Sequence, residues 1–319
     1  MKLIRIYFVL VFIFLAIAGC SSKKEQQPLS RLESERKIIQ ILENDHNLKP
    51  VAQWEGDTFW IYIPIEKPLF AIAASGTSRT VEKKYILQFV ESIFNNSTLE
   101  IEYDVVPAFK MAPPNGITNR YTQTFNNKYQ NITNALSRAF FTAKNPPKFI
   151  VVIIADIKDG IEMMTTFYTE DLKKYQSGAL PADEYMVRIH NEPYGADEIK
   201  NDKEGKHVES YDIKMRDFVS RQIKNRINFK FQNSDFPPDK NYKDEIIDAI
   251  IKTFHAYDFN DFSSVSLNDL RQDKKQTLSF EKIKKLQDPL PKEKASSEGK
   301  VITIDFSDMI KGLKKDSDQ

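Results

Sequence analysis

The chain has 319 residues, of which 46 are Lys or Arg and 45 are Asp or Glu, so its formal net charge is only +1. A chain this close to neutral lacks the basic excess of a nucleic-acid-binding protein, and we expect no nucleic-acid partner. The sequence contains a single cysteine, Cys20, which excludes an internal disulfide and a thiolate metal site.

The first 20 residues combine two positive charges with a short apolar run. Lys2 and Arg5 precede an apolar segment that continues unbroken over residues 7–19. A helix needs roughly 20 apolar residues to span a bilayer, whereas this run has the length of a signal-peptide core. Its end, residues 17–20 (Ile-Ala-Gly-Cys), is similar to the lipobox of bacterial lipoproteins.

The resemblance to bacterial lipoproteins implies that residues 1–19 are a signal peptide and that the mature chain begins at Cys20. It also implies diacylglycerol and acyl (palmitate) modification of Cys20, which would anchor the protein to a membrane of the cell envelope. Ser21 implies the outer membrane, facing the periplasm, in a host with two membranes. The alternatives are a plain secretory signal with an incidental cysteine and an N-terminal anchor helix. No further cofactor is expected.

The segment after the signal predicts a tether and then a helix–hairpin unit. Residues 20–30 are polar, and Ser30 with Glu33 has the pattern of a capping box at the start of a helix. Apolar positions continue this helix to about residue 44. Two β-prone stretches over residues 51–65 then flank Gly56-Asp57, which is typical of a tight hairpin turn.

A second stretch has the same order of elements. Apolar residues over 129–143 predict a helix, residues 148–155 predict a buried strand, and Asp159-Gly160 predicts a turn before an extended stretch. We therefore expect an α+β fold for residues 31–270, with a mixed or antiparallel sheet built from helix–hairpin units. Two related halves, 31–110 and 120–270, are a further hypothesis.

The remaining elements of the body are predicted from shorter patterns. Residues 84–94 fit both a strand and a short helix. Apolar periodicity predicts helices near residues 170–190, 215–224 and 243–254. The other predicted strands are 70–75, 99–106, 227–231 and 262–267.

Residues 271–319 differ in composition from the body. They are charged, carry Pro289 and Pro291, and predict a disordered tail. Residues 301–310 are an apolar, β-prone exception, in which Val301, Ile302, Ile304 and Phe306 are candidate partner-binding residues. Such a segment can add a strand to a sheet edge, either of this protein or of an envelope protein partner.

Few residues are candidates for catalysis. Asp156 and Asp159 follow a buried strand, a position where ligand-binding groups gather in α/β sheets, although Asp159-Gly160 is also a common turn. His207 lies in a polar loop with acidic neighbours, but no histidine spacing indicates a metal site, so none is expected. The predicted helix that ends near Arg226 carries five basic residues, for which ion pairs are favoured over contact with anionic lipid headgroups.

These patterns favour a non-enzymatic lipoprotein of the cell envelope that binds a partner or supports an assembly. The alternatives are a lipid-anchored hydrolase that uses Asp156, Asp159 or His207, and a lipoprotein that binds wall fragments or a solute. The sequence leaves the question of enzymatic activity open.

Overall fold

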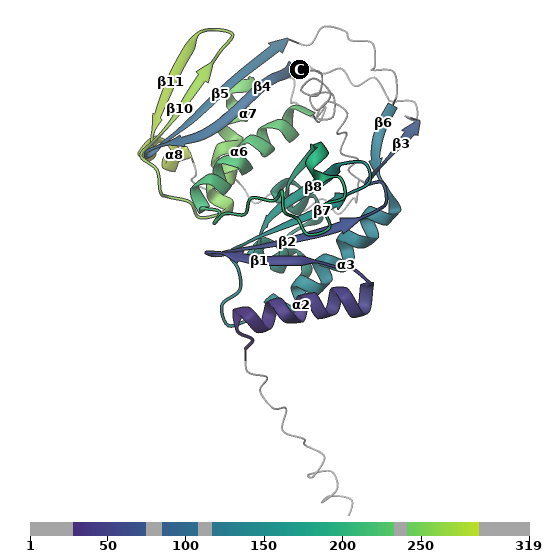
Figure 1. Ribbon diagram of the computed structural model, residues 1–319. Coiled ribbons are helices and arrows are strands. Elements are labelled where there is room, and N and C mark those ends of the chain that lie inside the picture. The colour runs from purple at the N-terminus through teal and green to yellow at the C-terminus, as the bar shows by residue number, and fades with distance from the viewer. Residues whose placement is uncertain (1–27, 75–84, 108–116, 233–240, 287–319) are drawn as a thin grey trace, which may run out of the picture.

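The computed structural model describes residues 28–74, 85–107, 117–232 and 241–286, which form an α+β fold (Figure 1). The helices are α2 (Arg31–His46), α3 (Gln123–Phe140), α4 (Thr169–Gln176), α5 (Ala182–Arg188), α6 (Met215–Gln232), α7 (Tyr242–Ala256) and α8 (Phe280–Leu286), with a 3-10 turn, η1 (Asp197–Ile199). The strands are β1 (Val51–Glu55), β2 (Thr58–Ile65), β3 (Phe70–Ala74), β4 (Tyr85–Asn95), β5 (Thr98–Pro107), β6 (Ile117–Tyr121), β7 (Phe149–Asp156), β8 (Ile161–Tyr168), β9 (His190–Gly195), β10 (Ser264–Asp269) and β11 (Lys274–Ser279). Cys20 and residues 301–310 lie outside the described residues.

Each of the two larger sheets contains two hairpins, and the first sheet has β9 as a fifth strand beside β8. The five-stranded sheet has the order β1-β2-β7-β8-β9, and its hairpins β1–β2 and β7–β8 meet through the parallel strands β2 and β7. The four-stranded sheet has the order β11-β10-β5-β4, and its hairpins meet through the parallel strands β5 and β10. Parallel neighbours need a long crossover, which contains α3 in the first sheet and α6 and α7 in the second. Strands β3 and β6 form a separate antiparallel pair.

The predicted helix–hairpin units are present as α2-β1-β2 and α3-β7-β8. Ser30 forms the expected capping box with Glu33 at the start of α2. The sheets, however, divide the chain differently from the ranges 31–110 and 120–270. Hairpin β4–β5 lies within the first range but pairs with β10–β11 near the end of the body, so each sheet draws strands from both parts of the chain.

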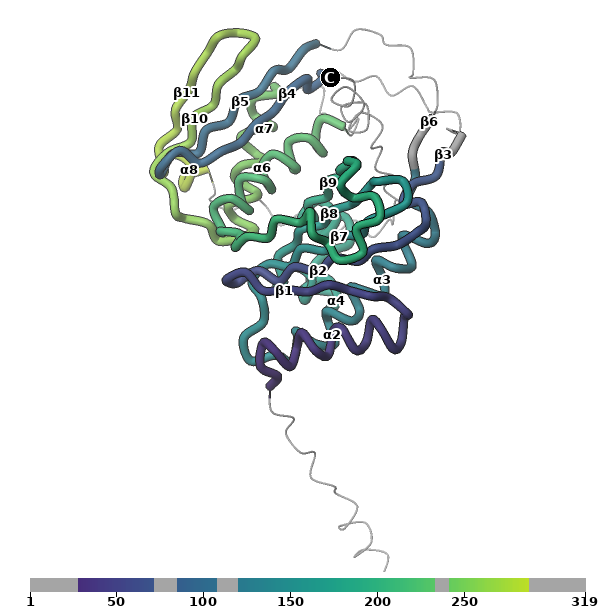
Figure 2. The backbone as a smooth tube through the Cα atoms, in the orientation of Figure 1, coloured from purple at the N-terminus to yellow at the C-terminus, as the bar shows by residue number. Residues whose placement is uncertain are grey.

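Helices and sheets alternate in layers, as Figures 1 and 2 show. Helices α2 and α3 cover one face of the five-stranded sheet and bury Leu42 and Leu136 against it. Helix α6 lies between the two sheets. Its Phe218 packs on the second face of the five-stranded sheet, whereas its Val219 and Ile223 pack on the inner face of the four-stranded sheet.

Two sequence predictions are corrected by this arrangement. Residues 227–231 are the end of helix α6 and not a strand, because Ile227 and Phe231 continue the stripe of Val219 and Ile223 into the same core. The folded body also extends past residue 270 to Leu286. Residues 274–286 form β11 and α8, which bury Leu278 and Ile283 in that core despite their many lysines.

Candidate functional sites

His207 lies between two carboxylates on the second face of the five-stranded sheet. Its Nδ1 is 2.5 Å from Oδ2 of Asp202, and its Nε2 is 2.8 Å from Oε2 of Glu162 on β8. All three side chains are less than 10% exposed: His207 is 8% exposed, and Glu162 and Asp202 are each 9% exposed. A protonated imidazole can donate to both carboxylates at once, so the geometry fits an imidazolium ion.

The pKa values of the three groups agree with that geometry. Burial opposes the charge on His207, but the hydrogen bonds to Asp202 and Glu162 outweigh it and raise the pKa of His207 above its ordinary value. Burial raises the pKa of Glu162. Burial acts in the same direction on Asp202, but its hydrogen bonds with the His207 ring and nearby backbone N–H groups lower its pKa to about 2.

His207 belongs to a segment, residues 200–214, that we name the strap because it crosses this sheet face between η1 and α6. Tyr62 on β2 donates its hydroxyl hydrogen to the Asp202 carbonyl at 2.6 Å, and the Trp60 indole donates to the Tyr211 carbonyl at 2.9 Å. Gly205 has a φ of +68°, and a Cβ there would lie 2.8 Å from the Tyr62 ring. The strap therefore lies directly on the sheet, and His207 is one of the groups that hold it there.

In this arrangement carboxylates contact both ring nitrogens of His207 and help to hold the strap on the sheet. A general base must offer a free ring nitrogen to its substrate, whereas both nitrogens of His207 are held by carboxylates.

Asp156 caps the turn after β7, where its Oδ1 accepts hydrogen bonds from the backbone N–H groups of Lys158 and Asp159 at 3.0 and 3.3 Å.

Asp156 and Asp159 share one turn, but His207 lies on the other side of the sheet from Asp156. Along β7, Ile154 packs toward α2 and α3, and Asp156 continues that side by strand alternation. On β8, Glu162 shares the opposite side with Met164, where His207 contacts it. The Asp159 side chain is exposed in the turn.

A pocket of about 490 Å³ lies beside Glu162 at the β8–β9 end of the five-stranded sheet. It is lined by Glu162, Met164, Glu192, Pro193 and Tyr194. Oε1 of Glu192 is 2.8 Å from Nε2 of His190. Burial raises the pKa of Glu192, but the neighbouring His190 and Arg221 lower it by more. No group of three or more His, Cys, Asp or Glu side chains suited to a metal ion occurs among the described residues.

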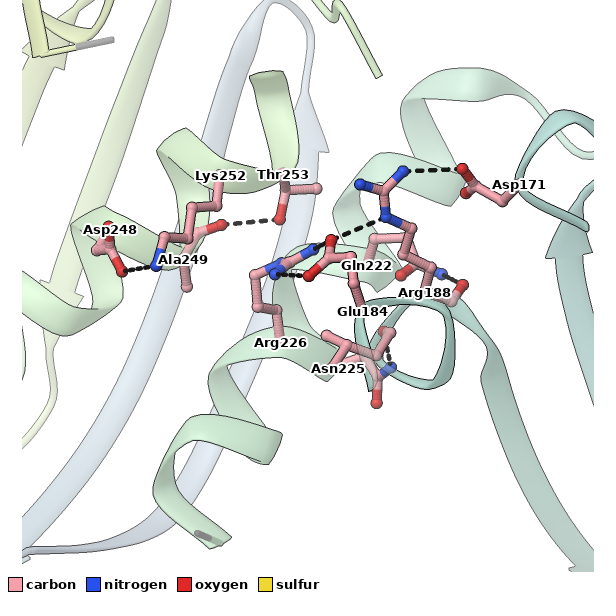
Figure 3. Close-up of polar contacts among 11 residues, drawn as sticks. Asp171, Glu184, Arg188, Gln222, Asn225, Arg226, Asp248, Ala249, Lys252 and Thr253 are labelled. Carbon is pink, nitrogen blue, oxygen red and sulfur yellow. Dashed lines mark hydrogen bonds and ion pairs between the residues drawn. The ribbon is translucent and has the colours of Figure 1, made fainter. Parts of the chain in front are cut away.

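A buried ionic cluster joins α4 and α5 to α6, and sequence reasoning missed it (Figure 3). Arg188 pairs with Asp171 and Glu184 at 2.8 Å each, and Arg226 binds Glu184 through two nitrogens at 2.7 and 3.2 Å. Asp171 is only 2% exposed and Arg188 11%. We name these four residues the clamp.

Around the clamp, amide side chains of α6 extend the polar contacts. Gln222 donates to the Arg188 carbonyl, and Asn225 donates to the carbonyls of Val187 and Ile189. The sequence contains one signal for this contact: Gln222 and Asn225 interrupt the periodic pattern of the predicted helix. The other basic residues of this helix also have acidic partners within 4 Å, as expected; they are Lys214, Arg216, Arg221 and Lys224.

A second pocket, of about 610 Å³, lies beside the start of helix α6. Its lining comes from the start of β7, the start of α6 and the loop after α7, and includes Lys148, Lys214, Tyr257 and Asp261. Positive and negative side chains both line it, so its charge alone does not select a ligand of one sign.

The side of the four-stranded sheet away from α6 is a third candidate. Along β5, Leu99, Ile101, Tyr103 and Val105 are buried against the helices, whereas the alternate residues Glu100, Glu102 and Asp104 point the other way. On the neighbouring edge strand β4, Phe89 is 44% exposed and Ile93 is 60% exposed. We name this side the outer face. None of the helices or strands in the described ranges covers it in Figures 1 and 2.

Within the described ranges, no helix has the length and apolar character required to cross a membrane. No protein family, curated protein or solved structure was found to match the chain.

Proposed function

We propose that this protein is a membrane-anchored lipoprotein of the cell envelope that serves as a non-enzymatic binding or assembly component. The observation that carries the proposal is the position of the outer face. The described chain enters the fold beside α2, at the opposite end of the molecule from the four-stranded sheet (Figure 1). An anchor at Cys20 would therefore leave the outer face directed away from the membrane.

A short tether would keep the α2 end of the body close to the membrane. Residues 20–28 can span at most about 30 Å when fully extended, at roughly 3.4 Å per residue. The α2 end is thus held near the lipid, while a partner in the adjacent compartment can reach the outer face. The structural roles of His207 and Asp156 support binding over hydrolysis as the activity of the body.

The anchor is tested by palmitate labelling and by the mass of the mature N-terminal peptide. We expect the label on a peptide that begins at Cys20, and no label in the Cys20→Ala variant. An unlabelled mature protein that begins at another residue would contradict the lipoprotein assignment.

Partner binding is tested by cross-linking and co-purification from native membranes, with the full-length protein compared with a chain that ends at Gly299. A partner captured by the first and lost from the second would assign Val301, Ile302, Ile304 and Phe306 to docking. A partner captured by both would assign docking to the body. Substrate turnover by the purified protein that depends on His207 or Asp156 would overturn the non-enzymatic proposal.

Solute binding is a second candidate, supported by the 610 Å³ pocket beside the start of helix α6. A ligand that binds only the native state raises the melting temperature. We expect a solute that occupies this pocket to lose its stabilising effect in a Lys148→Ala variant, because Lys148 lines the pocket and is exposed. A flat response across a broad metabolite panel would remove this candidate.

A further inference from the structure

The outer face has a charge pattern that the fold itself does not need. Four carboxylates occupy two adjacent strands: Glu91 on β4 and Glu100, Glu102 and Asp104 on β5. Glu91 stands directly opposite Glu102 in the β4–β5 register. Like charges at opposed positions of an antiparallel pair reduce stability. This arrangement of carboxylates therefore lowers the stability of the folded protein, and a binding role would explain why it is present.

Only part of this negative charge is balanced within the described residues. Lys224 pairs with Glu91 at 2.6 Å, and Arg271 pairs with Asp104 at 2.9 Å. The two central carboxylates have amide partners instead: Glu102 accepts from Asn268 at 3.1 Å and Glu100 from Asn95 at 3.5 Å. An amide satisfies a hydrogen bond but adds no positive charge, so Glu100 and Glu102 form no ion pair within the described residues.

Exposed apolar side chains lie among these carboxylates. Ile93 is opposite Glu100 in the register, and Phe89 is opposite Asp104. Ile93 is the most exposed of the large apolar residues that the structure describes, and Phe89 is also exposed. Interface centres combine apolar anchors with charged groups around them. The combination of exposed apolar residues and unbalanced carboxylates thus indicates an interaction surface and not only a solvated sheet.

We propose that the outer face binds a protein segment that presents Lys or Arg side chains on either side of an apolar side chain. The cations would pair with Glu100 and Glu102, and the apolar group would cover Ile93. A second copy of the same face does not fit, since stacking two such faces would oppose carboxylates to carboxylates. An anionic membrane surface is repelled for the same reason.

This inference rests on the proposed function, because it names the surface and the partner chemistry of the same binding protein. The probe is a labelled synthetic peptide of alternating lysine and isoleucine, with a glutamate–isoleucine peptide as its counterpart. Fluorescence anisotropy is measured with the full-length lipidated protein in phosphatidylcholine vesicles. We expect the basic peptide to bind, and the affinity to fall as salt is raised from 50 to 200 mM.

Two variants then separate the charged and apolar parts of the surface. We expect Glu100→Gln/Glu102→Gln to weaken binding at least tenfold without lowering the melting temperature, since it removes like-charge repulsion. Ile93→Ser should weaken binding several-fold at both salt concentrations. The matched control is Glu35→Gln/Glu43→Gln on α2, which changes charge equally at the opposite end and should leave binding unchanged.

Three results would overturn the inference: equal binding by the wild type and the glutamate variant, equal binding by the α2 control and that variant, or no effect of Ile93→Ser. Binding that appears only in a chain ending at Gly299 would also overturn it, since the C-terminal segment would then be the occupant. Capture of a partner in the co-purification experiment would persist through these failures, so the proposed function and this inference fail separately.

Discussion

The two sheets differ in how many of their faces the described parts of the protein cover. All eight residues of β7, in the middle of the five-stranded sheet, are buried, because helices α2 and α3 cover one face and the strap with α6 covers the other. In the four-stranded sheet, β5 buries alternate residues only. Both strands pair with one parallel and one antiparallel neighbour. The layer that covers each face, and not the strand pairing, therefore decides which residue types each position tolerates.

We expect the largest loss of stability from a change in the clamp, because the clamp joins α4 and α5 to α6. Arg188→Ala leaves the almost fully buried Asp171 without its cation. Removing one partner of a buried ion pair typically costs about 3–5 kcal/mol in the free energy of unfolding. Urea unfolding monitored by circular dichroism measures this loss.

The control for the clamp is Lys173→Ala, which removes an exposed helical ion pair with Glu170. It should change the free energy of unfolding by no more than about 0.5 kcal/mol. Similar losses in the two variants would show that the clamp contributes no more than a surface pair, and that packing alone holds α6 against the first sheet.

Adjacent residues on β7 and β5 test the difference between the sheets directly. Ile153 and Ile154 face opposite sides of β7 and both are buried, so each change to Ala should cost about 2–5 kcal/mol. On β5, Ile101→Ala should cost as much, but Glu102→Ala should stay within about 0.5 kcal/mol. A large loss for Glu102→Ala, measured in the same denaturation series, would mean that the outer face is covered in solution.

The smallest expected effect concerns the strap and depends on pH. The folded-state pKa of His207 is raised, so its contribution to stability is complete below its ordinary pKa of about 6.5 and is lost as the pH rises through the folded value. The loss of stability in His207→Gln should therefore be largest near pH 6 and shrink toward pH 9. Thermal unfolding across this range measures it.

His255→Gln is the matched control for this pH series, because His255 is exposed on α7. As a substitution at an exposed position, it should change the free energy of unfolding by no more than about 0.5 kcal/mol. If His207→Gln lost the same stability at every pH, the imidazole would be held by packing and not by its charge. The contribution of Asp202 to stability should be complete above its ordinary pKa of about 3.8 and be lost as the pH falls through its folded-state pKa of about 2.

Local patterns in the sequence were sufficient for many of the elements. The Ser30 capping box, the hairpin around Gly56-Asp57 and the buried strand 149–156 follow from short-range chemistry and were predicted correctly. The α+β class follows from the two helix–hairpin units. Residues 84–94 remained ambiguous because the exposed residues of β4, Phe89 and Ile93, break the alternation that identifies a half-buried strand.

Tertiary structure decided what local patterns leave open. Hairpin β4–β5 joins a strand pair more than 150 residues later, and no local signal specifies such a pairing. The clamp and the contact of His207 with Glu162 likewise join residues distant in sequence, whose charges alone resemble those of solvated surface groups. The sequence by itself thus determined the local elements and the predicted membrane address, whereas the covering of each sheet depended on which distant segments pack together, because burial is a property of the assembled layers.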